Sequence, residues 1–337
     1  MIHGGAPGGW IEFSANPNPA GTPAAVTAAV AAASYGRYAD LDRAAAEAHL
    51  ATDAGVAADS VLLTAGATEA IRLIASALVG RDQAVIVGPT YSEYARTAER
   101  AGATVVAEDA RPPPFDPPID RALARVSRSP GALFVCDPNN PTGRALGPAG
   151  LRQLIGSLPF DRTLVLDQSF GPFSPSSLDA GECLAAGEVV LVRSLTKVLA
   201  TPGLRLGYVI ARPATIATLR AAQDPWSVGA HAIAAAAVAS WTLPAEVRAL
   251  VVSWRERLVA ALPACGLDPV PSESSFLLAR AGPAAAALVA ALAERRIAVR
   301  SCASFGLPAY LRLAVRPPAE QDVLLRALTT IAEASAR

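Results

Sequence analysis

The stretch Val189-Val190-Leu191-Val192-Arg193-Ser194-Leu195-Thr196-Lys197 is the most informative part of this sequence. Its four consecutive apolar residues predict a buried strand, and the Ser-Leu-Thr-Lys that follows puts a lysine just beyond that strand. A single lysine in this position is ordinarily a solvated strand end. Further on, Gly203-Leu204-Arg205-Leu206-Gly207-Tyr208 brings an arginine to the start of another predicted strand. The surrounding sequence therefore decides whether Lys197 belongs to a site.

Other apolar runs of strand length lie on both sides of this stretch, and segments with helical periodicity separate several of them. Near-continuous apolar strands that alternate with helices predict a mostly parallel sheet covered on both faces, which is a three-layer α/β fold. The expected strands are 61–63, 84–87, 104–106, 132–135, 163–166, 189–192 and 206–210, and the expected helices include 69–78, 92–101 and 148–157.

The pattern changes after about residue 213. Long helical stretches at 213–222, 228–240 and 245–262 lead to strand-like runs at 275–278, 297–299 and 310–315, and a last helix is expected over 320–333. This order predicts a smaller C-terminal α+β domain. We therefore divide the chain into an N-terminal arm (1–40), a large domain (41–213) and a small domain (214–337).

The composition limits the possible functions. The 337 residues are 52% hydrophobic, and 29 basic and 29 acidic side chains give a net charge of zero, which argues against a nucleic-acid-binding surface. Four separated cysteines and three histidines without paired spacing give no metal motif. The first residues do not resemble a secretory signal, and the weakly polar run 228–240 is too short to cross a bilayer. We expect a cytoplasmic protein without a membrane partner.

Polar residues follow several of the predicted strands. Asp167 and Lys197 come directly after strand runs, and Gly66 and Asn140 follow two others at a distance of a few residues. Ligands of open parallel sheets bind outside the carboxyl ends of the strands. These four residues are therefore expected to share one pocket.

Taken in order, the turn Asn139-Asn140-Pro141-Thr142-Gly143, Asp167 after its strand, the Ser-x-x-Lys that ends at Lys197, and Arg205 resemble the fold-type I enzymes that use pyridoxal 5′-phosphate (PLP). The resemblance covers nearly the whole chain. It implies the PLP-dependent transferase fold, a PLP-binding role for residues 41–213, and a homodimer to which the arm 1–40 contributes contacts.

The resemblance also implies roles for individual residues. Lys197, Asp167 and Tyr91 are the expected catalytic residues: the lysine binds the cofactor covalently and moves protons at the substrate carbon, the aspartate faces the pyridine nitrogen, and the tyrosine stacks on the ring. Without the resemblance, Asp167 is also compatible with a helix N-cap and Tyr91 with core packing. The other implied cofactor contacts are Gly66, Ala67, Thr68, Ser194, Thr196 and Arg205 at the phosphate, Asn140 at the ring hydroxyl, and Tyr38 from the partner subunit.

Two subfamilies fit these motifs. Histidinol-phosphate aminotransferases share the Asn-Pro turn and the Gly-Leu-Arg-x-Gly-Tyr segment. Cobalamin-pathway L-threonine-O-3-phosphate decarboxylases are similar in addition at His3-Gly4-Gly5, Phe13-Ser14-Ala15-Asn16-Pro17-Asn18-Pro19 and Pro225-Trp226-Ser227-Val228. We favour the decarboxylase and keep the aminotransferase as the alternative. A catalytically inactive relative that only binds a ligand is a third possibility.

Both subfamilies act on phosphorylated small amines, which implies two anion contacts for the substrate. Arg312 matches the arginine that binds a substrate carboxylate with two hydrogen bonds. His3, Asn16 and Arg316 are the candidates for the second anion pocket. The sequence departs from related aminotransferases at Phe170, where they usually have a tyrosine whose hydroxyl donates to the cofactor ring oxygen. Without this hydroxyl, the electronic properties of the bound cofactor are expected to differ from those in ordinary aminotransferases, whereas PLP binding itself is not placed in question.

Overall fold

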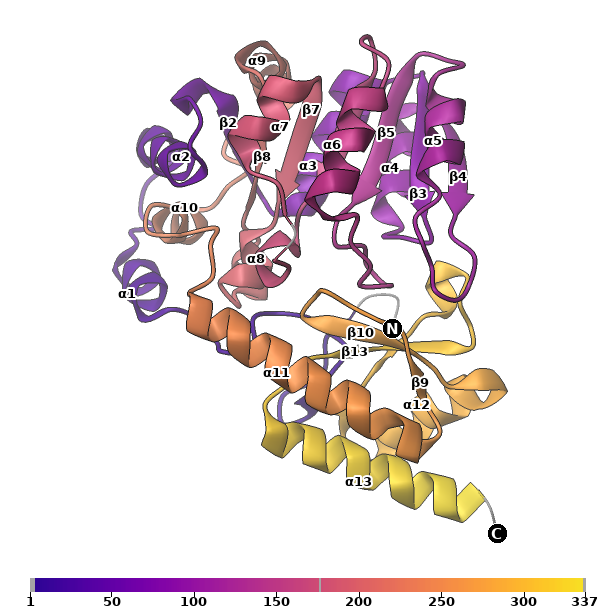
Figure 1. Ribbon diagram of the computed structural model, residues 1–337. Helices are drawn as coiled ribbons and strands as arrows, with labels where there is room; N and C mark the ends of the chain where they lie inside the picture. The colour runs from indigo at the N-terminus through magenta and orange to yellow at the C-terminus, as the bar shows by residue number, and fades with distance from the viewer. Residues whose placement is uncertain (1–3, 176, 336–337) are drawn as a thin grey trace.

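A seven-stranded sheet organises the larger lobe of the computed structural model, which describes residues 4–175 and 177–335 (Figure 1). Within these residues, every neighbouring pair of strands in the sheet is parallel except those that involve β8, which runs antiparallel to β2 and β7. The mostly parallel sheet predicted from the sequence is thus confirmed. The strands in spatial order are β2 (Val61–Thr64), β8 (Gly207–Ile210), β7 (Val189–Arg193), β6 (Thr163–Asp167), β5 (Gly131–Cys136), β3 (Gln83–Gly88) and β4 (Thr104–Asp109).

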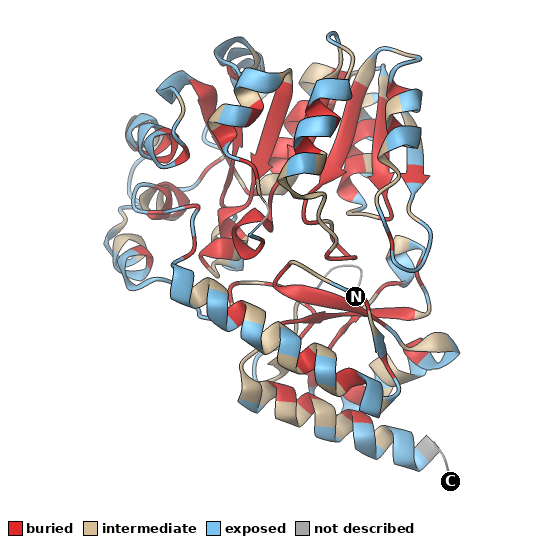
Figure 2. Cartoon of the chain, in the orientation of Figure 1, coloured by how far each residue is buried: buried red, intermediate tan, exposed pale blue. Residues whose placement is uncertain are grey.

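Helices cover both faces of this sheet, which gives the predicted three layers. The strands carry apolar side chains on both sides, so two separate cores form, and most of the sheet is buried (Figure 2). Val61 and Leu63 face one core, whereas Leu62 between them faces the other. The first core includes α2 (Asp40–Ala54), α5 (Ile119–Val126), α6 (Gly147–Ser157) and α7 (Ala180–Ala186); the second includes α3 (Ala67–Ile74), the π-helical turn η2 (Ala75–Val79), α4 (Glu93–Ala101) and α9 (Pro213–Ala222).

Two helices that follow residue 213 belong to the larger lobe by their packing. Helix α9 contacts β2 and α3, and α10 (Ala230–Ala236) contacts α2 and α1 (Ala24–Ala32). The sequence analysis grouped both with the smaller domain. The chain leaves the larger lobe through α11 (Ala245–Ala261), which runs along the smaller lobe in Figure 1.

The smaller lobe has its own antiparallel sheet, which has four strands in the described part of the chain. Helices α11, α12 and α13 pack with it around a third core. The N-terminal strand β1 pairs in parallel with β11, so residues 11 and 12 are attached to this lobe. The elements are β12 (Arg300–Ser301), β13 (Tyr310–Ala314), β10 (Phe276–Arg280), β9 (Asp268–Pro269), β1 (Ile11–Glu12), β11 (Ile297–Ala298), α12 (Ala285–Glu294) and α13 (Pro318–Ser335).

Short helical turns complete the fold. The one that carries the lysine is α8 (Leu195–Val198), directly after β7, and the 3₁₀ turn η4 (Pro202–Leu204) connects it to β8. Among the described residues, no helix combines the length and the apolar character needed to cross a membrane.

Candidate active site

A cavity of about 450 Å³ lies between the two lobes. The loops that follow β3, β5, β6 and β7 form its upper wall, and strands of the smaller lobe and the segment around Asn16 form the lower one. Most of the residues that the sequence analysis singled out meet here. The lining residues among those predicted are Asn16, Ala67, Thr68, Tyr91, Asn140, Asp167, Phe170, Ser194, Thr196, Lys197, Arg205 and Arg312.

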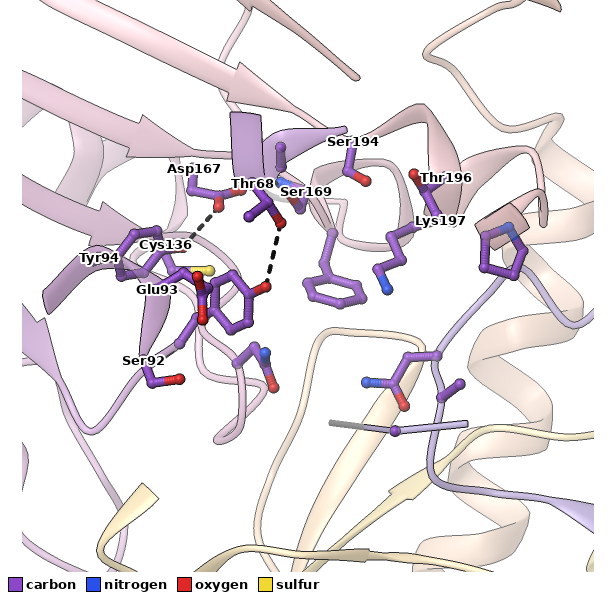
Figure 3. A pocket seen from close by; sticks show the side chains of 18 of the residues that line it. Thr68, Ser92, Glu93, Tyr94, Cys136, Asp167, Ser169, Ser194, Thr196 and Lys197 are labelled. Carbon is purple, nitrogen blue, oxygen red and sulfur yellow. Dashed lines mark hydrogen bonds between the residues drawn. The ribbon is translucent and has the colours of Figure 1, made fainter. Parts of the chain in front are cut away.

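Lys197 projects into this cavity from α8 (Figure 3). The short apolar strand β7 is fully buried, so the turn after it holds the lysine at the carboxyl edge of the sheet. Burial, and then the positive charges of Arg312 and Arg205, lowers the pKa of the Lys197 ammonium to about 8. A substantial fraction of the amine is therefore neutral near physiological pH and able to act as a nucleophile.

Asp167 ends β6 and is 3% exposed. Its Oδ1 accepts a hydrogen bond from the Ser169 backbone N–H at 2.8 Å, and its Oδ2 accepts one from the Tyr94 hydroxyl at 2.7 Å (Figure 3). Burial raises the pKa of Asp167, whereas hydrogen bonding by the Ser169 side chain, the Tyr94 hydroxyl and the Ser169 backbone, together with the charge of Lys197, lowers it. The carboxylate and the lysine line the same cavity. This is the arrangement needed if Asp167 is to face the protonated ring nitrogen of a cofactor that is bound to Lys197.

The start of α3 forms an anion cradle. Gly66 precedes the helix with φ of +77°, a conformation that favours glycine, and a Cβ there would lie 3.0 Å from Nη2 of Arg205. The helix N-terminus offers unpaired N–H groups and the positive end of its dipole. Ala67, Thr68 and Arg205 therefore bring backbone donors and a guanidinium to the same end of the cavity, and Gly66 packs against Arg205 just behind them.

The two hydroxyl residues near the lysine differ in their bonding. Ser194 and Thr196 are both buried and line the cavity. The Thr196 hydroxyl donates to the Leu206 carbonyl at 3.0 Å, so its proton is engaged by the backbone. Ser194 is accordingly the better placed of the two as a donor to a bound phosphate.

Aromatic side chains form the middle of the cavity. The Tyr91 hydroxyl lies 3.4 Å from that of Thr68, and burial raises the pKa of Tyr91. The Phe170 ring packs edge-on against Phe276, with ring centroids 4.8 Å apart, and the Lys197 Nζ lies 5.8 Å from the Phe170 centroid. Phe170 therefore lies beside the lysine and carries no hydroxyl there.

Arg312 is a buried cation in the lower wall. It is 6% exposed on β13 and donates to Asn140 Oδ1 and, at 2.6 Å, to the Ser14 carbonyl. With the amide of Asn16 turned so that its oxygen faces the guanidinium, this oxygen accepts from Arg312 Nε at 3.1 Å. Burial lowers the pKa of Arg312 to about 10, and within residues 4–175 and 177–335 it has no ion-pair partner. A buried cation without a carboxylate is suited to a substrate anion.

Sequence reasoning missed Arg300. This residue opens β12 and faces Arg312 directly in the antiparallel register, so two buried arginines lie side by side in the cavity wall. Arg300 donates to the Ser304 hydroxyl at 2.8 Å, and its guanidinium lies 5.4 Å from the Phe305 ring. To predict this residue from the sequence, one would have needed to know how the segment after the expected strand 297–299 pairs with the strand 310–315, because that pairing brings Arg300 next to Arg312.

Of the predicted residues that the structure describes, three are not among those that line this cavity: Gly66, Arg316 and Tyr38. Arg316 forms a two-bond ion pair with Glu320 at 2.9 and 3.0 Å and is not among the lining residues. Tyr38 is 71% exposed and stacks on Trp226 with ring centroids 4.6 Å apart. His3 lies outside the described residues.

The arrangement fits PLP in the chemistry of its donor groups. An amine of lowered pKa, a buried carboxylate and a cradle of backbone N–H groups beside a guanidinium line the same cavity, as this cofactor requires. Tyr91, between the cradle and the carboxylate, provides an aromatic ring at the same wall. These are the groups that would hold the phosphate, the ring and the reactive carbon of the cofactor.

Comparisons with known proteins agree with this geometry. The chain is 35% identical to histidinol-phosphate aminotransferase of Symbiobacterium thermophilum (94% of this chain, 89% of that protein) and 33% identical to threonine-phosphate decarboxylase of Salmonella typhimurium (98% and 93%). The structure of histidinol-phosphate aminotransferase from Sinorhizobium meliloti in complex with pyridoxal-5′-phosphate superposes with a TM-score of 0.86 at 23% identity, over 96% of this chain and 90% of that one. The model of aminotransferase class I and II matches residues 9–328. The chain therefore belongs to the class I and II aminotransferase family of PLP-dependent enzymes.

Proposed function

We propose that this enzyme is an L-threonine-O-3-phosphate decarboxylase of the kind that serves cobalamin biosynthesis. The observation that carries the proposal is the contact between Arg312 and residues 13–16. The Ser14 carbonyl and the Asn16 amide both hold the guanidinium. They belong to the N-terminal segment 13–19, whose sequence is similar to that of the decarboxylases. The decarboxylase-like segment thus shapes the substrate's anion site.

The paired arginines support the same substrate. L-threonine phosphate carries two anionic groups on one small molecule, a carboxylate at Cα and a phosphate at Cβ–O. Arg312 and Arg300 offer two buried cations in neighbouring strands. We assign the carboxylate to Arg312, with Asn16 beside it, and the phosphate to Arg300. Histidinol phosphate carries the phosphate alone.

The chain's own groups can perform the reaction. Bound PLP supplies the electron sink that stabilises negative charge at the substrate Cα. Arg312 orients the carboxylate, and when the Cα–carboxylate bond breaks, carbon dioxide leaves and its bonding electron pair remains on the Cα side. Lys197 in its ammonium form then delivers one proton to Cα. Asp167 keeps a proton on the pyridine nitrogen throughout. The product is 1-aminopropan-2-yl phosphate.

The alternative is transamination of histidinol phosphate with 2-oxoglutarate. It is favoured by the curated relatives, several of which are histidinol-phosphate aminotransferases with 29% to 35% identity to this chain. In that reaction the two arginines would bind the two carboxylates of 2-oxoglutarate. Lys197 would then take a proton from Cα instead of giving one.

Parallel assays separate the two reactions. The purified enzyme is incubated with L-threonine phosphate, and separately with histidinol phosphate plus 2-oxoglutarate. The proposal requires carbon dioxide and aminopropanol phosphate in the first assay, with turnover abolished in Lys197→Ala. Glutamate in the second assay without carbon dioxide in the first would assign the enzyme to the aminotransferases instead.

We further propose that the enzyme acts as a homodimer with C2 symmetry. Tyr38 and Trp226 form an exposed aromatic pair. A second stacked pair is formed by the exposed Tyr35 and by His231, which are close in sequence to Tyr38 and Trp226 respectively. Large exposed aromatic side chains that form such pairs are typical of subunit interfaces. In the dimer, Tyr38 would reach the cofactor phosphate of the partner subunit. A cytoplasmic location is also part of this proposal.

A further inference from the structure

Tyr94 is a buried tyrosine whose hydroxyl is hydrogen-bonded to Asp167 at the cavity wall. It lies in the first turn of α4, is 1% exposed, and donates to Asp167 Oδ2 at 2.7 Å. Its ring is held at right angles to Tyr91, with centroids 5.8 Å apart and an interplanar angle of 86°, and against Phe134, also at 5.8 Å. Packing therefore fixes the direction of the hydroxyl (Figure 3).

The hydrogen bond has a defined direction. Burial, and then the negative charge of Asp167, raises the pKa of Tyr94 well above its usual range, so the phenol stays protonated. A protonated phenol beside a carboxylate must be the donor. Asp167 therefore has one fixed donor on each oxygen, the Ser169 backbone on Oδ1 and Tyr94 on Oδ2. Both bonds are stronger when Asp167 is ionised.

Burial works in the opposite direction on the same carboxyl. It is the largest influence on Asp167 and raises the pKa of this group, which would weaken its hold on a protonated ring nitrogen. Ser169 acts on the carboxylate through its backbone N–H, which donates to Oδ1, and its side chain also lowers the pKa of Asp167. The Tyr94 hydroxyl, at 2.7 Å from Oδ2, is the donor on the other oxygen, and a single substitution removes it without touching the Ser169 loop.

We propose that Tyr94 is a positioning residue that fixes the plane of the Asp167 carboxylate and holds it ionised for the pyridine nitrogen. Because Tyr94 also contacts Tyr91, it links the group that anchors the ring nitrogen to the aromatic expected to cover the ring face. The inference rests on PLP as the cofactor and is independent of which bond of the substrate breaks. Tyr94 itself is not expected to touch the substrate.

The test uses Tyr94→Phe, which keeps the ring and removes the hydroxyl. We expect the Kd for PLP to rise about tenfold, because the hydrogen bond to a charged group is lost where Asp167 must be ionised. With PLP labelled with ¹⁵N in the ring, the NMR shift of the bound nitrogen should move toward the unprotonated value. Tyr208→Phe is the matched control, since Tyr208 is equally buried, is hydrogen-bonded to Arg193 and does not line the cavity.

The ¹⁵N shift distinguishes positioning from a merely structural role, because loss of packing would lower stability without changing the protonation of the nitrogen. On an Asp167→Asn background, the Tyr94→Phe substitution should change the Kd for PLP by less than about twofold, since the carboxylate through which it acts is gone. If Tyr94→Phe does not fold, 3-fluorotyrosine incorporated at position 94 keeps ring and hydroxyl and should still move the ¹⁵N signal. An unchanged ¹⁵N shift and an unchanged Kd in the hydroxyl-free variant, or an unmoved signal with fluorotyrosine, would overturn the proposal.

Discussion

Replacement of Arg312 by glutamine tests two effects of this residue separately: its effect on the stability of the ligand-free enzyme and its effect on the affinity for substrate. Burial lowers the pKa of Arg312 to about 10, which corresponds to a penalty of about 3 kcal/mol for keeping the guanidinium charged in the cavity. The unfolded chain binds this proton up to a higher pH than the folded one. Folding stability therefore gains from this group only as the pH rises through about 10, and near neutral pH the whole penalty applies.

The penalty is offset by the contacts of the guanidinium. Arg312 donates to Asn140, the Ser14 carbonyl and Asn16, and each bond contributes about 1 kcal/mol net. The two contributions nearly cancel. We therefore expect Arg312→Gln to change the free energy of unfolding of the ligand-free enzyme by no more than about 1 kcal/mol.

Substrate binding should respond very differently. The substrate carboxylate would lose a buried two-bond partner, and truncation of such a pair costs about 2 kcal/mol or more, so the Kd should rise at least about 30-fold. Urea denaturation measures the first effect. Titration of L-threonine phosphate into PLP-loaded Lys197→Ala enzyme, with and without Arg312→Gln, measures the second without turnover.

A second buried arginine provides the control. Arg193 is 4% exposed, bonds to Gln168, lies 4.9 Å from the Trp241 ring and does not line the cavity. Arg193→Gln should lower stability and leave the Kd for L-threonine phosphate unchanged. A loss of 3 kcal/mol or more in ligand-free Arg312→Gln, together with an unaltered Kd, would show that Arg312 serves the fold and would refute the reasoning.

Four further predictions concern the cofactor and the dimer. The rate of PLP capture by the apoenzyme, followed by absorbance, should rise between pH 7 and 9 with a midpoint near the Lys197 pKa of about 8, because only the neutral amine reacts; a midpoint near 10 would contradict this. Borohydride reduction and peptide mapping should place the label on Lys197 and nowhere else. Phe170→Tyr should lower the pKa that the visible absorbance of bound PLP reports, since it restores a donor beside the ring; an unchanged titration would mean that another donor already acts there. Sedimentation should give a dimer at micromolar concentration, and Tyr38→Phe should weaken PLP binding while the dimer stays intact. A monomer that binds PLP with full affinity would disprove this prediction.

The sequence predicted the sheet well because its strands are buried on both faces. Each predicted strand of the larger lobe appears as one of β2 to β8, within one residue of its expected bounds except β4, which extends three residues beyond the expected end. Helices α1 and α2 were not predicted: α1 is almost uniformly alanine and valine and has no polar face, and residues 1–40 were interpreted as an arm. The placement of α9 and α10 against the larger lobe depends on tertiary contacts with α2 and α3, which no local pattern encodes.

The candidate site was predictable where a polar residue follows a predicted strand and its side chain matches one group that the cofactor needs. Lys197, Asp167 and Asn140 were found in this way, and all three line the cavity. Arg300 and Tyr94 were not found, because their importance comes from partners distant in sequence. Arg300 matters through its register with Arg312, and Tyr94 through a bond to Asp167, 73 positions away.

The contacts of Arg312 also explain how one family can perform two reactions with the same catalytic groups. The substrate bond that lies perpendicular to the cofactor ring is the one that breaks, and the plane of the Arg312 guanidinium sets the direction of the carboxylate. That plane is held from one side by Asn140, which also lines the cavity, and from the other by Ser14 and Asn16. A change in residues 13–16 can therefore rotate the carboxylate and leave Lys197 and Asp167 undisturbed. The choice between loss of carbon dioxide and loss of a proton is thus expected to follow the N-terminal segment, far in sequence from the lysine that both reactions use.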